Sequence, residues 1–300
     1  MPRIKYRSIN FRGNVREMIA QANEIIEAYS AKGFRLTLRQ LYYQFVSRDL
    51  FPNTQQSYKK LGSAVNDGRL AGLIDWDAIE DRQRGVKVLA SWDSPADIIS
   101  SAARSFRIDK WAGQTYRPEV WVEKDALVGV MADVCNELQI PYLSCRGYTS
   151  QSTMWECAQR LQGIIDGEQT PIILHFGDHD PSGLDMTRDI RDRLSMFMGG
   201  TEVDRLALNM DQVRKYKPPP NPAKEADSRF EDYVRAYGKS CWELDALDPE
   251  KLAALVRKQV LALRDDTAWA KAEKAETKQR RVLTAMSRRF DDVSKFLGVR

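Results

Sequence analysis

The stretch from Pro171 to Arg188, PIILHFGDHDPSGLDMTR, joins an apolar run to a polar cluster that ends it abruptly. The run is typical of a buried strand, Gly177 predicts a tight turn, and the Pro-Ser pair after the turn predicts the start of a helix. Asp178 and Asp180 are therefore expected together in this turn. Two carboxylates about 4 Å apart repel each other by roughly 4 kcal/mol at an effective dielectric constant near 20. A metal ion would remove that cost.

Another carboxylate ends an earlier apolar run, in the sequence Glu119-Val120-Trp121-Val122-Glu123. Parallel sheets bind ligands at the carboxyl ends of their strands, so two such strands side by side would bring Glu123, Asp178 and Asp180 together. A few hard oxygen ligands suit Mg²⁺, with water and phosphate completing its coordination. The sequence therefore predicts a magnesium site and phosphoryl-transfer chemistry.

These motifs resemble a known family. The pattern of a Glu after one strand and an Asp-x-Asp motif after a later strand is similar to the pattern of the Toprim fold, which topoisomerases, primases and several nucleases share. More narrowly, Glu123-Lys124, Arg146-Gly147-Tyr148 and Asp178-His179-Asp180-Pro181-Ser182-Gly183 resemble the topoisomerase VI A subunit and the meiotic double-strand-break transesterases. The resemblance covers roughly residues 35–210, and the Asp-x-Asp-Pro-x-Gly form is its most specific part.

Composition sets the broader class. The chain has 300 residues, of which 43% are hydrophobic, enough for a packed core. It has no apolar run of about 18 residues and no signal peptide at MPRIKYRSIN, so no membrane partner is expected. Its four cysteines lack CxxC spacing, which favours reduced core thiols. We expect a cytoplasmic, nucleoid-associated protein.

The charge is unevenly distributed. Residues 1–90 carry 15 Lys and Arg against 9 Asp and Glu, and residues 271–300 carry 9 against 4, although the net charge is only +4. The middle of the chain is therefore acidic. Basic ends around an acidic centre suit a protein that binds a phosphate backbone and holds a metal, although solvated surface helices would give the same pattern.

The N-terminal third predicts a helix-turn-helix. Thr37 and Gln40 form a capping box for a helix from Leu38, and a turn leads to a second helix over about 57–73. The segment 73–84 is a candidate wing. The outward side of the second helix offers four candidate DNA-binding side chains: Lys59, Ser63, Asn66 and Arg69.

Helical geometry places Tyr42 on the buried face of the first of these helices and Tyr43 about 140° away from Leu38, facing outward. The motif Arg39-Gln40-Leu41-Tyr42-Tyr43 is also similar to the Arg-x-x-Tyr-Tyr motif of the same transesterases. In that family the second tyrosine attacks the DNA phosphate and the arginine assists, which implies Tyr43 and Arg39 here. The alternative is that both rings simply pack.

Strands and helices alternate in the middle of the chain, which predicts an α/β parallel sheet. The expected strands are 119–123, 140–145, 171–176 and 203–208, and the expected helices are 125–138, 150–164 and 182–198, the first capped by Asp125. The predicted domains are a winged-helix domain over 1–112, a Toprim-like metal-binding domain over 113–215 and an extended strap with helices over 216–300. In the last of these, Asp248 and Pro249 predict a helix running to Leu263.

Four further residues near the predicted site have open roles. Lys124 is expected to contact a phosphate or to pair with Asp125, and Arg146 to contact DNA or to lie in an exposed loop. His179 is expected to be structural or to support the metal ligands without binding the metal, because extended backbone turns it away from the two aspartates. Asp185 is not expected on the metal.

The leading hypothesis is a Mg²⁺-dependent DNA strand-cleaving transesterase, an isomerase resembling the topoisomerase VI A subunit, in which Tyr43 attacks double-stranded DNA. The resemblance implies a homodimer in which the tyrosine of one subunit meets the metal site of the other, and strand passage would need a separate ATPase subunit. One alternative is a Toprim nuclease that hydrolyses DNA with metal-bound water. Another is a DNA-binding protein without catalysis.

Overall fold

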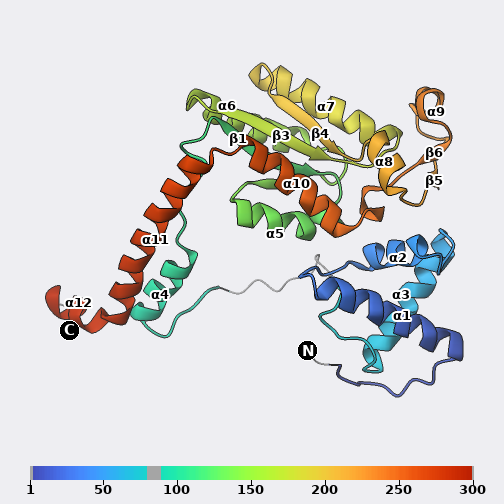
Figure 1. Cartoon of the computed structure of the whole chain (residues 1–300), viewed down its shortest axis with the longest axis horizontal. Coiled ribbons are helices and arrows are strands. Elements are labelled where there is room, and N and C mark those ends of the chain that lie inside the picture. Colours follow the sequence, from blue (N-terminus) through green and yellow to red (C-terminus); the bar gives the residue numbers. More distant parts are fainter. Residues whose placement is uncertain (1–2, 80–88, 299–300) are drawn as a thin grey trace.

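A parallel sheet of four strands organises the computed structural model, which describes residues 3–79 and 89–298 (Figure 1). The strands are β1 (Tyr116–Val122), β2 (Tyr142–Ser144), β3 (Thr170–Phe176) and β4 (Glu202–Ala207), in the order β2-β1-β3-β4. All three neighbouring pairs are parallel. The α/β parallel-sheet prediction is therefore confirmed, while the Toprim and winged-helix assignments stay predictions.

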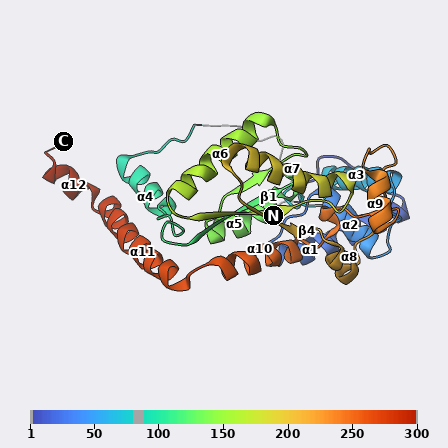
Figure 2. The ribbon, with the colours of Figure 1, turned by 90° about the horizontal axis from the view of Figure 1, so that it is seen from above.

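Helices cover both faces of the sheet. They are α5 (Val128–Leu138), α6 (Gln151–Asp166), α7 (Pro181–Met198), α8 (Met210–Tyr216) and α10 (Pro249–Leu263). Figure 2 shows α6 and α7 on one side of the sheet and α5 and α10 on the other. Val120 and Val122 pack in the α5/α10 core, whereas Trp121 packs in the α6/α7 core. Burial on both faces explains why the strands read as continuous apolar runs.

The N-terminal helices form a separate core. They are α1 (Gly13–Ser30), α2 (Leu38–Ser47) and α3 (Gln55–Leu70). The capping box of Thr37 and Gln40 is confirmed at the start of α2. After α3, the described residues of the expected wing form one isolated bridge, between Ile79 and Leu36. The rest of the expected wing, from residue 80 to 84, lies outside the described residues.

A helical arm projects from the α/β body (Figure 1). It consists of α4 (Pro95–Ser105) packed along α11 (Asp266–Arg288), followed by α12 (Phe290–Phe296). The sequence-based division placed α4 in a domain with the N-terminal helices. In the structure α4 packs instead on α11, because Arg280 donates to the Phe106 carbonyl and Ser287 to the Ala96 carbonyl.

The strap after α8 returns to the sheet edge. Its elements are β5 (Asn221–Pro222), α9 (Phe230–Tyr237), β6 (Ser240–Cys241) and the 3₁₀ helix η2 (Leu244–Ala246). Backbone hydrogen bonds join His179 and Trp242 in both directions, at 2.8 and 3.0 Å. His179 is buried among aromatic rings and bonds the Tyr233 hydroxyl, as its structural role predicted. This bridge carries η2 to the carboxyl edge of the sheet, where it also meets α2.

Most predicted element boundaries hold within a few residues, and the Asp248 cap of α10 is confirmed. The start of the helix at residue 125 is a correction. A 3₁₀ turn, η1 (Asp125–Leu127), precedes α5, and Asp125 pairs with Arg146 at 3.3 Å instead of capping a helix. Within the described part of the chain, every helix is too short or too polar to cross a membrane.

Candidate active site at the carboxyl edge of the sheet

The three predicted carboxylates meet where β1 and β3 end. Strand pairing sets Val122 opposite Phe176, and the residues that follow come together. The Oε2 atom of Glu123 accepts the backbone N–H of Asp178 at 2.8 Å. Asp180 begins α7, where its Oδ1 atom accepts the N–H of Gly183 at 2.6 Å. All three carboxylates line one pocket of about 1030 Å³, as predicted from the two apolar runs.

The turn between β3 and α7 depends on small residues and on one arginine. A Cβ atom at Gly183 would lie 2.3 Å from the carbonyl oxygen of Asp178, so only glycine fits there. The guanidinium of Arg205, on β4, donates to the carbonyls of Asp178 at 2.5 Å and Gly183 at 2.9 Å. The close backbone approach at Gly183 and the hydrogen bonds from Arg205 therefore fix the turn that carries Asp178 and Asp180.

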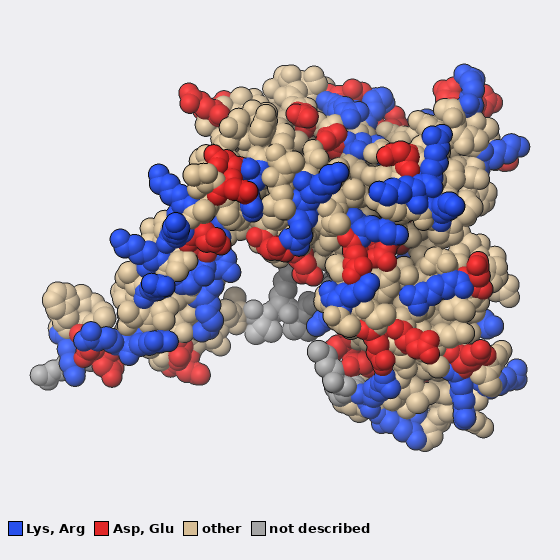
Figure 3. Space-filling view, in the orientation of Figure 1, with Lys and Arg blue, Asp and Glu red and all other residues tan. Residues whose placement is uncertain are grey.

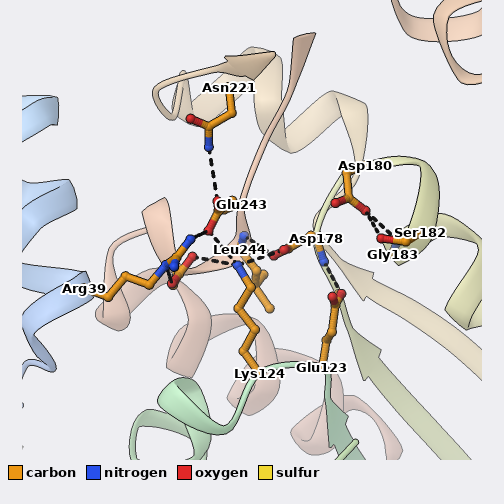
Figure 4. Close-up of polar contacts among 12 residues, drawn as sticks. Arg39, Glu123, Lys124, Asp178, Asp180, Ser182, Gly183, Asn221, Glu243 and Leu244 are labelled. Carbon is orange, nitrogen blue, oxygen red and sulfur yellow. Dashed lines mark hydrogen bonds and ion pairs between the residues drawn. The ribbon is translucent and has the colours of Figure 1, made fainter. Parts of the chain in front are cut away.

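Lys124 lies at the centre of the acidic cluster (Figure 4). Its Nζ atom is 2.8 Å from Asp178 Oδ2, 2.8 Å from Glu243 Oε2 and 3.0 Å from Asp245 Oδ1. Pairing with Asp125, one of the two roles expected from sequence, was wrong. The reason is that η2 brings two acids from 120 residues further along the chain into reach of the ammonium group.

Arg39 joins the N-terminal helices to the same cluster. From the first turn of α2 its guanidinium pairs with Glu243, and its Nε atom lies 2.7 Å from Asp245 Oδ2. Because Lys124 and Arg39 share both acids, the four side chains form one alternating network of charge. This network positions Arg39 at the pocket of its own chain.

Burial makes ionisation of the carboxylates at the strand ends unfavourable. Burial, together with the charge of Asp178, raises the pKa of Glu123 to about 7. Burial raises the pKa of Asp178 to about 6 although Lys124 opposes the shift. Burial also opposes ionisation of Glu243, yet Lys124 and Arg39 lower its pKa to about 2. Negative charge is therefore well compensated at Glu243 and poorly compensated at Glu123.

Tyr43 does not face solvent, and that prediction was wrong. Its side chain is 3% exposed and Tyr42 is 4% exposed, because η2 and the strap cover the side of α2 that an isolated helix would leave open. The Arg39 guanidinium lies 5.8 Å from the Tyr43 ring centroid, and the Asn221 side chain bonds Asn53 at 2.7 Å and Glu243 at 3.3 Å. Burial and the nearby carboxylates of Asp245 and Glu243 raise the tyrosine pKa above its usual value. Asn221 lines the pocket of the same chain, whereas Tyr43 does not.

The predicted DNA-binding residues occupy two places. Lys59, Ser63 and Asn66 are exposed on α3, away from the pocket lining. Arg69 donates to the carbonyls of Trp76 and Ile79 at 2.9 and 2.8 Å, so part of its hydrogen-bonding capacity supports the fold.

Two further cations line the pocket itself. Arg146, with 75% of its side chain exposed, lies on the pocket wall together with Lys224 from the strap. Asp185 accepts from the Tyr148 hydroxyl and pairs with Arg188, away from the three carboxylates.

The donor set fits a hard cation. Across residues 3–79 and 89–298 no three His, Cys, Asp or Glu side chains are already arranged to hold a metal ion. One reason is that both oxygens of Asp178 are engaged, by the Leu244 N–H at 2.8 Å and by Lys124. Glu123, however, has a second oxygen that no described donor contacts, and its raised pKa reflects uncompensated charge. Carboxylate oxygens that lack a compensating cation suit Mg²⁺. Asp178 would join them as a ligand once the ammonium group of Lys124 moves away from it.

Sequence reasoning missed Glu243, Asp245 and Asn221. The acids lie two apart in Trp242-Glu243-Leu244-Asp245, and this alternation of apolar and acidic residues was their only local signal. Nothing local assigns them to the site, since the long return of the strap brings them there. No family model, curated protein or solved structure matches this chain.

Proposed function

We propose that this protein cleaves DNA phosphodiester bonds in a Mg²⁺-dependent hydrolysis at the pocket between β1, β3 and the strap. The observation that supports it most is the meeting of Glu123, Asp178 and Asp180 at the ends of two adjacent parallel strands, within a pocket that also contains cations. Carboxylates with cations at one strand edge suit a phosphate held against a metal. The resemblance to Toprim proteins points to the same chemistry.

The roles follow from position and charge. Glu123, Asp178 and Asp180 would hold Mg²⁺, which would polarise the phosphate and lower the pKa of a bound water. Arg39, Arg146 and Lys224 line the pocket and would bind the phosphate oxygens.

Glu123 also has a property that suits proton transfer. Its second carboxylate oxygen, which no described donor contacts, would accept the proton of the attacking water. The new phosphorus–oxygen bond forms as the bond to the leaving sugar oxygen breaks, and that oxygen takes a proton from solvent water to leave as a hydroxyl group. Water is the favoured nucleophile because the Tyr43 side chain is buried and does not line the pocket.

A second candidate is transesterification by Tyr43, the leading hypothesis from sequence. One observation favours it: Arg39, which lines the pocket, lies with its guanidinium 5.8 Å from the Tyr43 ring centroid. Exchange of this tyrosine between two subunits of a homodimer, and a separate ATPase subunit, stay predictions.

The test is plasmid cleavage with Mg²⁺, quenched with detergent and analysed with and without proteinase. Wild type is compared with Asp178→Asn, Tyr43→Phe and the control Asp192→Asn, which changes a 60% exposed acid on α7. Thermal unfolding of each variant checks that it folds.

We expect Asp178→Asn to lose at least 100-fold in rate, and Tyr43→Phe and Asp192→Asn to match wild type with free DNA ends. If the breaks require Tyr43 and the DNA ends carry attached protein, the mechanism is transesterification and the proposal of hydrolysis is wrong. Wild-type protein that binds DNA but cleaves nothing with Mg²⁺ would refute both.

A further inference from the structure

The long helix α11 separates its charges by face. Its three acids are all engaged beside the body: Asp266 with Arg264 at 2.6 Å, Glu273 with Lys110 at 3.6 Å, and Glu276 with the N–H of Ile108 at 3.0 Å. Among its basic residues Arg280 turns the same way and pairs with Glu276. The side of α11 that packs on α4 is therefore electrically satisfied.

Five other basic residues of α11 are exposed, and no ion-pair or hydrogen-bond partner is found for their side chains in the described part of the chain. We call them the basic stripe: Lys271, Lys274, Lys278, Arg281 and Arg288. Their spacing of three, four, three and seven residues confines them to about 100° of the helix surface at 100° per residue. The same geometry sets them on the side opposite Glu276 and Ser287, which contact α4 and its flanking loop. Figure 3 shows Lys and Arg side chains along this arm.

The arm presents the stripe on a supported helix. At its base the Trp269 ring packs edge-on against Trp111, with centroids 5.8 Å apart, and Gln114 bonds the backbone of Asp265 in both directions. At a rise of about 1.5 Å per residue the stripe is about 25 Å long. Because duplex DNA carries one charge per about 1.7 Å of axis, this length spans roughly seven base pairs.

We propose that the basic stripe of α11 binds the phosphate backbone of duplex DNA outside the pocket, independently of base sequence. A protein partner is disfavoured because three of the five residues are lysines, which protein interfaces are depleted in. Unpaired cations in a row suit a polyanion, whose binding releases counterions. The identity of that polyanion as DNA rests on the proposed function. The stripe would hold the duplex while the pocket acts on one phosphate.

The experiment measures fluorescence anisotropy of a labelled 40-base-pair duplex in EDTA, so that cleavage does not interfere, between 50 and 200 mM salt. The test variant is Lys271→Gln/Lys274→Gln/Lys278→Gln. The matched control removes three exposed cations elsewhere, for whose side chains no partner is found in the described residues: Arg16→Gln/Arg214→Gln/Lys258→Gln. A third variant, with Arg in place of the same three stripe lysines, keeps the charge.

The expected result is a lower slope of log affinity against log salt for the Gln stripe variant, by about 0.9 per lost phosphate contact and so by roughly 2 to 3. Its affinity should fall tenfold or more, while the control and the Arg variant stay within twofold of wild type. Plasmid cleavage under the conditions given above separates this inference from the proposed function.

An unchanged slope in the Gln stripe variant, with Asp178-dependent cleavage intact, would overturn the stripe alone. Equal losses in the stripe variant and the control would also overturn it, because net charge would then explain the effect. Loss of self-association in sedimentation with an unchanged slope would assign the stripe to a protein contact. Wild type that fails to bind duplex DNA at all would overturn both proposals.

Discussion

Replacing Glu123 by Gln should stabilise the protein at pH 8 and abolish its proposed activity. The carboxylate is 9% exposed, and burial with the charge of Asp178 raises its pKa from 4.5 to about 7. The folded protein therefore holds this proton more tightly than the unfolded chain does. Stability that is present at low pH is lost as the pH rises from about 4.5 through about 7.

The size of the effect follows from the shift. One pKa unit corresponds to about 1.4 kcal/mol, so ionising Glu123 costs the wild-type fold about 3 kcal/mol at pH 8. Glutamine still offers an oxygen to the Asp178 N–H, which Glu123 accepts at 2.8 Å, and it cannot ionise. We expect Glu123→Gln to gain about 2–3 kcal/mol over wild type at pH 8 and nothing at pH 4.5.

Urea unfolding at pH 4.5 and pH 8 measures this difference. The control is Glu119→Gln on the same strand, where a buried carboxylate, 1% exposed, pairs with Arg160. Losing that ion pair should destabilise by about 1–3 kcal/mol at pH 8. Saturating Mg²⁺ should stabilise wild type at pH 8 and have little effect on Glu123→Gln. The account of uncompensated charge would be wrong if Glu123→Gln were less stable than wild type at pH 8. It would also be wrong if the difference in free energy of unfolding between variant and wild type were the same at both pH values.

Three further changes test the site and its supports. Lys124→Met should lower the free energy of unfolding by about 3 kcal/mol, because it leaves Asp178 and the fully buried Asp245 short of a cation. Calorimetry should show that Mg²⁺ binds this variant more tightly than wild type. Weaker binding would contradict the competition between Lys124 and the metal for Asp178. Gly183→Ala should cost at least 2 kcal/mol in urea unfolding, since its Cβ would lie 2.3 Å from the Asp178 carbonyl; a neutral result would show that the turn can relax. Asp248→Ala removes the cap of α10, which accepts the Glu250 N–H at 2.9 Å, and should lower stability by about 1–2 kcal/mol; a loss below 0.3 kcal/mol would mean that water replaces the cap.

The sequence could predict the strand ends because the signal there is local. An apolar run buried on both faces must be followed by a turn, and parallel pairing brings such turns to one edge. Glu123, Asp178 and Asp180 therefore come together without knowledge of the rest of the chain. The same is true of the helix starts at Thr37 and Asp248, where a cap side chain bonds its own helix.

What only the tertiary structure decided is what covers and compensates those residues. Tyr43 faces outward on an isolated helix, yet it is buried because the strap and η2 pack over α2. Lys124 has an acid beside it in sequence, yet it pairs with Glu243 and Asp245, about 120 residues away, because an ion pair forms with whichever charges share its buried environment. Periodicity and caps act over one helical turn or one strand, whereas burial and charge compensation depend on segments that only chain folding brings together.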